Sequence, residues 1–285
     1  MPELPEVETI VNDLAKTING KIIRGIKIID NKVINVKPSL FIKTLKGEKI
    51  VKVRRRGKLV IIKLKKVYLV IHLKMTGQLV FVSNKSIIAG GHTIKNIGRS
   101  LPNKYTRFIL EFNNKNCLYF NDQRRFGWVR LLNQDELDDT LNKLGVEPLS
   151  KEFDFIKLNL ILKNKKKSFV KQALLDQKII AGIGNIYADE SLFAANIKPT
   201  RRVGDLKSFE IKKLSQVIKE KLKLAIKNRG TTFNNYVDTG GNKGNFSRFL
   251  KVYGRTGKKC KKCESIILKI KLGGRGTHYC EKCQK

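Results

Sequence analysis

The alternation of apolar and polar positions divides the chain into a helical start, a long β-rich stretch and a second helical stretch. Over residues 5–18 the apolar positions recur at intervals of three and four, at Val7, Ile10, Val11, Leu14 and Ile18. This interval predicts an amphipathic helix, and Pro5 suits its first turn. Residues 21–132 consist of short segments rich in Val, Ile and aromatic residues, such as LVIIKL and VYLVIHL. Such segments, with no helix expected between them, predict a β-sandwich or barrel.

The second half of the chain is predicted to be mostly helical. Residues 133–150 are acidic and typical of a connection, whereas residues 173–199 fit a helix, a tight Gly-Ile-Gly-Asn turn and a second helix that stops before a proline. A long amphipathic helix follows, with Gly230 at its end. Residues 231–250 are polar and rich in glycine, which is typical of a mobile loop. We expect residues 251–285 to form a separate small unit.

The charge of the chain indicates a polyanionic partner. Its 285 residues include 60 Lys and Arg but only 24 Asp and Glu, which gives a formal net charge of +36. A positive field of this size attracts nucleic acid of any sequence, and an anionic membrane surface is the main alternative. No apolar run approaches the ~18–20 residues that cross a bilayer, and the acidic N-terminus lacks the apolar segment of a secretory signal. Charge alone does not separate an enzyme from an architectural protein.

Four cysteines near the C-terminus predict a metal site. They follow the pattern C-x2-C-x16-C-x2-C, at Cys260, Cys263, Cys280 and Cys283. Two close pairs of thiolates separated by a hairpin-sized span can surround one Zn²⁺ tetrahedrally, and nothing in the chain favours export and disulfides instead. We therefore expect one structural Zn²⁺, because a unit this small lacks a sufficient core of its own.

The N-terminal sequence MPELPEVET contains a second candidate site. Removal of Met1 would expose Pro2 as a secondary amine, which can attack a sugar C1′ and form an iminium ion. An α-amino group titrates near ~7.7–8, so the reactive neutral form is accessible at neutral pH. Glu3 beside it is a candidate general acid or base. Taken alone, the segment favours a proline that merely precedes a helix over a nucleophile.

Motifs along the whole chain, in the same order, resemble one family. They are MPELPEVET, RRRGK at 54–58, HLKMTGQL at 72–79, DQRRFG at 122–127, AGIGNIYADESLF at 181–193 and GRGTHYCEKCQK at the end. Together they resemble the bacterial formamidopyrimidine-DNA glycosylases, which excise 8-oxoguanine and ring-opened purines from DNA.

The resemblance implies an α+β protein with defined boundaries. An N-terminal helix and a β-sandwich form the catalytic domain (1–132), and a linker follows (133–150). A helical domain with a helix-two-turn-helix and a lesion-capping loop comes next (151–250). A zinc-finger β-hairpin with four cysteine ligands ends the chain (251–285).

The resemblance also implies four catalytic roles. Pro2 attacks C1′ and forms the Schiff base, and Glu3 is the acid that opens or protonates the sugar. Lys58 matches the lysine assigned to β-elimination. Arg275, on the zinc hairpin, matches the arginine that holds phosphate and serves δ-elimination.

Three further residues match the positions that fill the gap left by an extruded base. They are Met75, Arg124 and Phe126. Phe126 suits a wedge between stacked bases, and Arg124 can bind the unpaired cytosine. By periodicity alone, Met75 and Phe126 fit core residues instead.

A last group matches positions that contact DNA phosphates. Asn185 opens the second helix of the helix-two-turn-helix, where backbone N–H groups favour an anion. Lys166 and Lys171 match basic positions, although the choice among the lysines at 165–167 stays open. Tyr105 stands where the family usually has a histidine, and a tyrosine hydroxyl can still donate to a phosphate.

We therefore expect a DNA glycosylase and abasic-site lyase that acts on oxidised purines by β,δ-elimination. It would be a monomer in the bacterial cytoplasm, associated with the nucleoid and bound to damaged double-stranded DNA. One alternative is an endonuclease VIII-type glycosylase for oxidised pyrimidines, which typically has Gly where Leu4 stands here. Another is a zinc-ribbon nucleic-acid-binding protein without catalysis, against which the Pro2, Glu3, Lys58 and Arg275 set argues.

Overall fold

A computed structural model describes residues 1–84, 87–91, 101–231 and 245–285. Most of the expected lesion-capping loop, residues 232–244, lies outside the described residues. The chain divides into two compact units. The first combines Met1–Asn142 with Asn228–Asn245, and the second combines Lys143–Lys227 with Phe246–Lys285.

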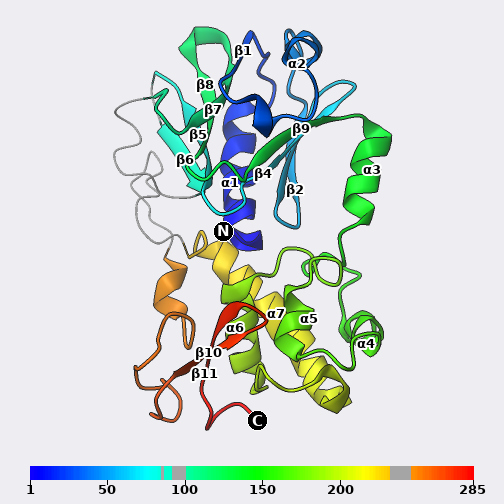
Figure 1. Cartoon of the computed structure of the whole chain (residues 1–285), viewed down its shortest axis with the longest axis vertical. Coiled ribbons are helices and arrows are strands. Elements are labelled where there is room, and N and C mark those ends of the chain that lie inside the picture. Colours follow the sequence, from blue (N-terminus) through cyan, green and yellow to red (C-terminus); the bar gives the residue numbers. More distant parts are fainter. Residues whose placement is uncertain (85–86, 92–100, 232–244) are drawn as a thin grey trace. The chain divides into compact units, whose positions relative to one another are not determined.

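The first unit contains two antiparallel sheets (Figure 1). The larger has the order β1 (Gly25–Ile28), β7 (Thr106–Glu111), β8 (Cys117–Asp122), β5 (Gly77–Val82) and β6 (Ile87–Gly91). The smaller has the order β2 (Lys52–Arg56), β3 (Leu59–Lys63), β4 (Tyr68–His72) and β9 (Trp128–Leu132). Residues of both sheets share one hydrophobic core, which confirms the predicted β-sandwich.

Helix α1 (Leu4–Ile18) begins two residues after Pro2 and packs against β2 and β6. Its apolar stripe faces the core, and Val7, Ile10 and Leu14 are each at most 3% exposed. This burial is what the interval of three and four residues predicts. Because the stripe holds the helix in the sandwich, the first turn and the N-terminus have a defined place in this unit.

Two helices lie where the sequence predicted none. Helix α2 (Pro38–Leu45) interrupts the β-rich stretch, with Phe41 and Leu45 buried one turn apart. Its eight residues are too few for apolar spacing to distinguish a helix from a strand. Helix α3 (Gln134–Asn142) occupies the acidic connection. Acidic residues in its first turn, Asp135 and Glu136, suit the positive end of the helix dipole.

The second unit is helical and ends in a β-hairpin. Its elements are α4 (Phe155–Lys163), α5 (Val170–Leu175), α6 (Asn185–Ala195), α7 (Ser208–Lys227), β10 (Leu268–Leu272) and β11 (Arg275–Tyr279). Short 3₁₀ turns complete the two units, at Asn31–Val33, Asn113–Lys115, Val203–Asp205 and Phe246–Phe249. The predicted second helix corresponds to α6, but the first differs from the prediction, because α5 starts at Val170 and ends at Leu175, and the non-helical residues 176–184 lead to α6. No helix in the described part of the chain has the length and apolar character needed to span a membrane.

Candidate functional site

The N-terminal residues lie against the first turn of α1. Glu3 is only 4% exposed, and its backbone N–H donates to Glu6 Oε2 at 3.0 Å. The Glu3 carbonyl in turn accepts from the Val7 N–H at 3.0 Å, so Glu3 is fixed as the residue that caps the helix. Pro2 is half-buried beside it. The proposed nucleophile therefore precedes a residue whose backbone is held at both its N–H and its carbonyl.

Lys58 lies in the turn between β2 and β3, and a chain of contacts joins this turn to α1. Arg55 Nε is 2.6 Å from Glu8 Oε2, and Arg55 Nη1 donates to the Gly57 carbonyl at 3.0 Å. Gly57 has a φ of +56°, which glycine adopts without strain. Lys58 is 6% exposed. The Glu8–Arg55 pair could not be predicted from the sequence, because nothing in the local pattern links positions 47 residues apart.

Met75, Arg124 and Phe126 form an exposed cluster in the first unit. Met75 is 39% exposed and Phe126 is 53% exposed, so neither is the core residue that periodicity alone suggested. The Arg124 guanidinium carbon lies 4.7 Å from the Phe126 ring centroid, a cation–π contact. The two segments meet, since the Arg124 N–H donates to Thr76 Oγ1 at 3.0 Å.

The turn that carries Met75 is held by a neutral histidine. Lys74 has a left-handed φ of +48°, and its N–H donates to His72 Nδ1 at 2.9 Å. Burial lowers the pKa of His72 to about 3, with smaller contributions from Lys74 and Lys58. The ring therefore stays neutral at physiological pH, and Nδ1 can act as an acceptor. At Gly77 a Cβ would lie 2.2 Å from the Leu73 carbonyl oxygen, so the turn closes only with glycine.

Tyr105 is half-buried in the same unit, directly before β7. The Lys104 ammonium lies 5.3 Å from the Tyr105 ring centroid. The Tyr105 carbonyl accepts from the Asp122 N–H at 2.8 Å. A tyrosine flanked by a lysine is compatible with a phosphate contact. Its role in place of the family histidine stays a prediction.

The structure does not place Lys171 where a phosphate contact requires it. Its side chain is 1% exposed, and Nζ lies 2.6 Å from Asp189 Oδ1. The ammonium also donates to Thr277 Oγ1 at 2.9 Å and to the Gly276 carbonyl at 3.0 Å. Asp189 Oδ2 accepts from the His278 N–H at 2.9 Å. Lys171 is therefore a buried cation that ties α5 and α6 to strand β11.

The remaining predicted phosphate contacts lie in the same unit. Asn185 begins α6 and its Nδ2 donates to the Gly276 carbonyl at 2.9 Å, so it also holds β11. Among the lysines at 165–167, Lys165 is 3.4 Å from Asp176 Oδ2. Lys166 is exposed, and its carbonyl accepts from the Gly204 N–H at 3.0 Å. Phosphate binding by Asn185 and Lys166 stays a prediction.

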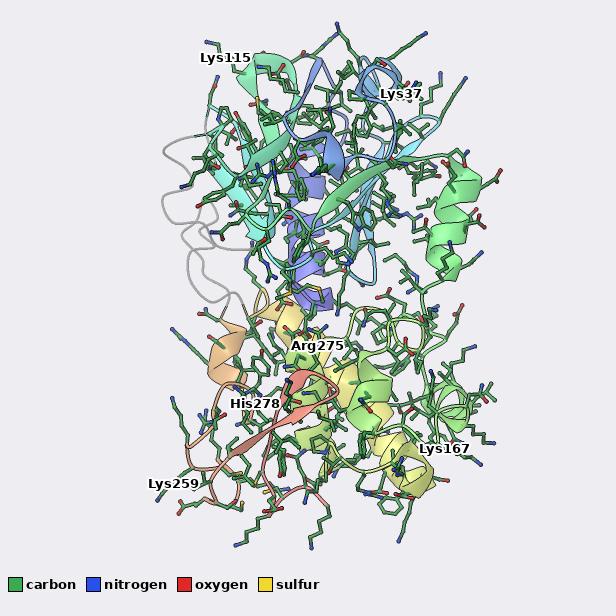
Figure 2. All side chains as sticks on the ribbon, in the orientation of Figure 1. Lys37, Lys115, Lys167, Lys259, Arg275 and His278 are labelled. Atoms are coloured by element: carbon green, nitrogen blue, oxygen red, sulfur yellow. The ribbon has the colours of Figure 1, made fainter. Side chains whose placement is uncertain are left out.

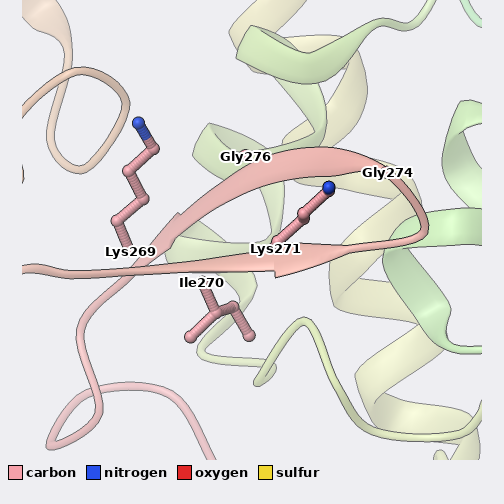
Figure 3. Close-up of a pocket in the computed structure, with 5 residues that line it drawn as sticks. All are labelled: Lys269, Ile270, Lys271, Gly274 and Gly276. Carbon is pink, nitrogen blue, oxygen red and sulfur yellow. The ribbon is translucent and has the colours of Figure 1, made fainter.

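Arg275 is exposed at the start of β11, next to the hairpin turn (Figure 2). The turn residues Gly273 and Gly274 have φ values of +54° and +74°. The hairpin also lines a pocket of about 390 Å³ with Lys269, Ile270, Lys271, Gly274 and Gly276 (Figure 3). Lys269 and Lys271 alternate with Ile270 and point to the opposite side of their strand (Figure 3). The four predicted catalytic residues thus divide between the units, with Arg275 in the second.

The four cysteines fit a tetrahedral metal site. Their sulfur atoms all lie within 4.8 Å of one another, with Cys260–Cys283 at 3.9 Å and Cys263–Cys280 at 3.4 Å. Four sulfurs at ~2.3 Å from one Zn²⁺ would be about 3.8 Å apart. A hydrogen bond with Ser265 lowers the pKa of Cys263 to about 6, which favours the thiolate that binds metal. These residues would hold a zinc ion.

The first unit is thus a β-sandwich with Pro2 and Glu3 at its start, and the second is a helical unit that ends in a four-cysteine hairpin. Family models agree along the chain. The formamidopyrimidine-DNA glycosylase N-terminal domain matches residues 1–129, its H2TH domain matches 144–236, and the zinc finger found in FPG and IleRS matches 257–285.

Relatives and solved structures agree with these models over the full length. The formamidopyrimidine-DNA glycosylase of Pelotomaculum thermopropionicum is 41% identical, with 100% of this chain and 99% of the relative covered. That of an Exiguobacterium species is 38% identical, with both chains fully covered. A Lactococcus lactis FPG mutant in complex with Fapy-dG DNA superposes with a TM-score of 0.89 at 32% identity over 100% of both chains. The L. lactis complex with abasic-site DNA gives 0.88 at 32% over 99% of both.

The chain belongs to the formamidopyrimidine-DNA glycosylase family, whose members are DNA-repair glycosylases and abasic-site lyases. Family membership confirms the predicted fold, the predicted enzyme class and the predicted DNA-binding, zinc-finger character.

Proposed function

We propose that this protein removes 8-oxoguanine and formamidopyrimidines from double-stranded DNA and then cleaves the abasic site by β,δ-elimination. One observation carries the proposal. The Pro2–Glu3 pair at the start of α1 belongs to the same compact unit as the exposed Met75, Arg124 and Phe126. A nucleophile for C1′ and a cluster that can replace an extruded base are the two things that a base-flipping glycosylase requires.

The chemistry follows from the residues that the chain presents. After removal of Met1, the Pro2 nitrogen forms a bond to C1′ while the bond from C1′ to the damaged base breaks, and the proton that the amine loses passes to the departing base. Glu3 gives a proton to O4′, which opens the sugar and leaves a cationic iminium at C1′. The iminium withdraws electrons, so a base can remove a proton from C2′ and the 3′ phosphate leaves with the electron pair of its C–O bond. Loss of a proton from C4′ then expels the 5′ phosphate in the same way. Lys58 would assist the first elimination and Arg275 the second.

The zinc ion has a structural role in this proposal. The four thiolates would hold one Zn²⁺ that stabilises the hairpin carrying Arg275, and the metal takes no part in the reaction. We further propose a monomer that works in the bacterial cytoplasm, associated with the nucleoid. The bacterial relatives and the damaged DNA bound by the Lactococcus lactis structures support this setting.

The test compares lesions under single-turnover conditions. We expect faster excision of 8-oxoguanine than of thymine glycol from otherwise identical duplexes. A matched control carries one extra residue before Pro2, which converts the amine to an amide and should abolish excision but retain DNA binding. Faster excision of thymine glycol would favour the pyrimidine-specific alternative. Binding without excision of either lesion would favour the non-catalytic one.

A further inference from the structure

We propose that Asp122 is a positioning residue that fixes the two gap-filling segments, Met75 and Arg124–Phe126, in one arrangement before DNA binds. The inference rests on the proposed function, in which these side chains replace the extruded base. Asp122 belongs to the DQRRFG motif but contacts none of the reacting atoms in the proposed chemistry. It is 0% exposed, although both segments that it joins carry exposed side chains.

The sheet brings Asp122 to the point where both segments begin. Asp122 is the last residue of β8 and is paired with Gly77, the first residue of β5. The chain enters β5 directly from Met75 and Thr76, and it leaves β8 directly into the Arg124–Phe126 loop. One carboxylate at this register position can therefore reach the backbone of both.

The carboxylate binds the Arg124–Phe126 loop at both ends. Asp122 Oδ1 accepts from the Arg124 N–H at 3.2 Å, and Oδ2 accepts from the Gly127 N–H at 2.6 Å. Gly127 must be glycine for this approach, because a Cβ there would lie 2.6 Å from Phe120 Cζ and 3.0 Å from Asp122 Oδ2. Between these two anchors, Arg125 adopts a left-handed φ of +59°.

The same carboxylate binds the Met75 segment. The Thr76 hydroxyl donates to Asp122 Oδ1, and Thr76 Oγ1 accepts from the Arg124 N–H at 3.0 Å. Asp122, Thr76 and the Arg124 N–H thus form a closed triangle between the two segments. Arg107 Nε supports the strand end by donating to the Asp122 carbonyl at 3.0 Å.

An amide could not replace this carboxylate. Two carboxylate oxygens accept three hydrogen bonds, from one hydroxyl and two backbone N–H groups. Asparagine has a single acceptor oxygen, and its NH₂ would face either the Gly127 N–H or the Arg124 N–H. Asp122→Asn should therefore release one end of the loop at little change in volume. If the gap-filling side chains must become ordered during DNA binding, the cost of ordering lowers both the rate of excision and the selectivity for the opposite base.

The test measures single-turnover excision of 8-oxoguanine opposite cytosine and opposite adenine. A bidentate base contact gives a discrimination of roughly 5- to 150-fold. We expect Asp122→Asn to reduce the cytosine-to-adenine ratio at least about fivefold, with trapping of an abasic site in single-stranded DNA unchanged. Thr76→Val, which removes only the link between the segments, should lower the ratio in part, and Thr76→Ser should restore it.

The matched control is Asn35→Ala. Asn35 makes two hydrogen bonds with the Leu131 backbone, at 3.0 and 2.8 Å, in the same unit but outside both segments. This variant should lose stability without a change in the ratio. A wild-type ratio in both Asp122→Asn and Thr76→Val overturns the inference while the proposed function stands. If the wild-type protein fails to excise 8-oxoguanine, the proposed function itself fails.

Discussion

Replacing Lys171 with methionine tests whether this lysine is a buried structural cation or a contact to DNA phosphate. The Lys171 ammonium makes an ion pair of 2.6 Å with Asp189 and two hydrogen bonds of 2.9 and 3.0 Å to β11, and both ionic side chains are at most 1% exposed. Removing one partner of a buried pair costs about 3–5 kcal/mol, because the other charge stays buried. Asp189 keeps its bond from the His278 N–H, so we expect the lower end, about 3 kcal/mol.

The assay is thermal unfolding, with zinc release and DNA affinity measured on the same samples. At about 2 °C for each kcal/mol in a chain of 285 residues, Lys171→Met should lower Tm by about 6 °C. Adding Asp189→Asn should recover much of this loss, since no charge then stays buried and the His278 N–H keeps an acceptor. Lys166→Met is the control. It should leave Tm unchanged and reduce by about 0.9 the steepness with which the logarithm of the DNA-binding constant falls with the logarithm of the salt concentration. If Lys171→Met melts like the wild type and shows that change of slope instead, Lys171 is a phosphate contact and not a structural cation.

Three further predictions concern the other sites. Arg124→Ala should reduce the preference for 8-oxoguanine opposite cytosine over adenine by about 5- to 150-fold, and equal wild-type rates on the two duplexes would remove Arg124 from this role. Cys280→Ser should release zinc and weaken binding to all duplexes, whereas Arg275→Ala should keep zinc and lose processing of damaged DNA. If both variants behaved alike and retained zinc, the cysteines would not be metal ligands. The folded-state pKa of His72 is about 3, below the ordinary 6.5, so its contribution to stability is full above pH 6.5 and is lost as the pH falls toward 3. In urea unfolding, the free energy of unfolding should fall less between pH 7 and about pH 4.5 for His72→Gln than for the wild type. An equal fall in the two proteins would refute this assignment.

The sequence predicted elements whose apolar period is long and regular, and it missed those that depend on context. Helix α1 follows from a regular stripe of apolar positions along its whole length, whereas in α2 only Phe41 and Leu45 are fully buried. The motifs located Met75, Arg124 and Phe126, but only the packed sandwich decides that their side chains are exposed.

The same limit applies to the charged residues. Lys171 resembles its neighbours at 165–167 in the sequence, yet it is buried, because Asp189 and Gly276 reach it from α6 and β11. Asp122 opens a recognisable motif, but its partner Thr76 is 46 residues away. Tertiary contacts over such separations leave no periodic pattern in a single sequence.

The most direct test of the proposed mechanism is the site of covalent attachment to DNA. Borohydride reduction of the protein with an 8-oxoguanine duplex should trap an adduct, and peptide mapping by mass spectrometry should place it on Pro2. Loss of the adduct on addition of one residue before Pro2 would agree with this result. An adduct on an internal lysine such as Lys58 would contradict the account.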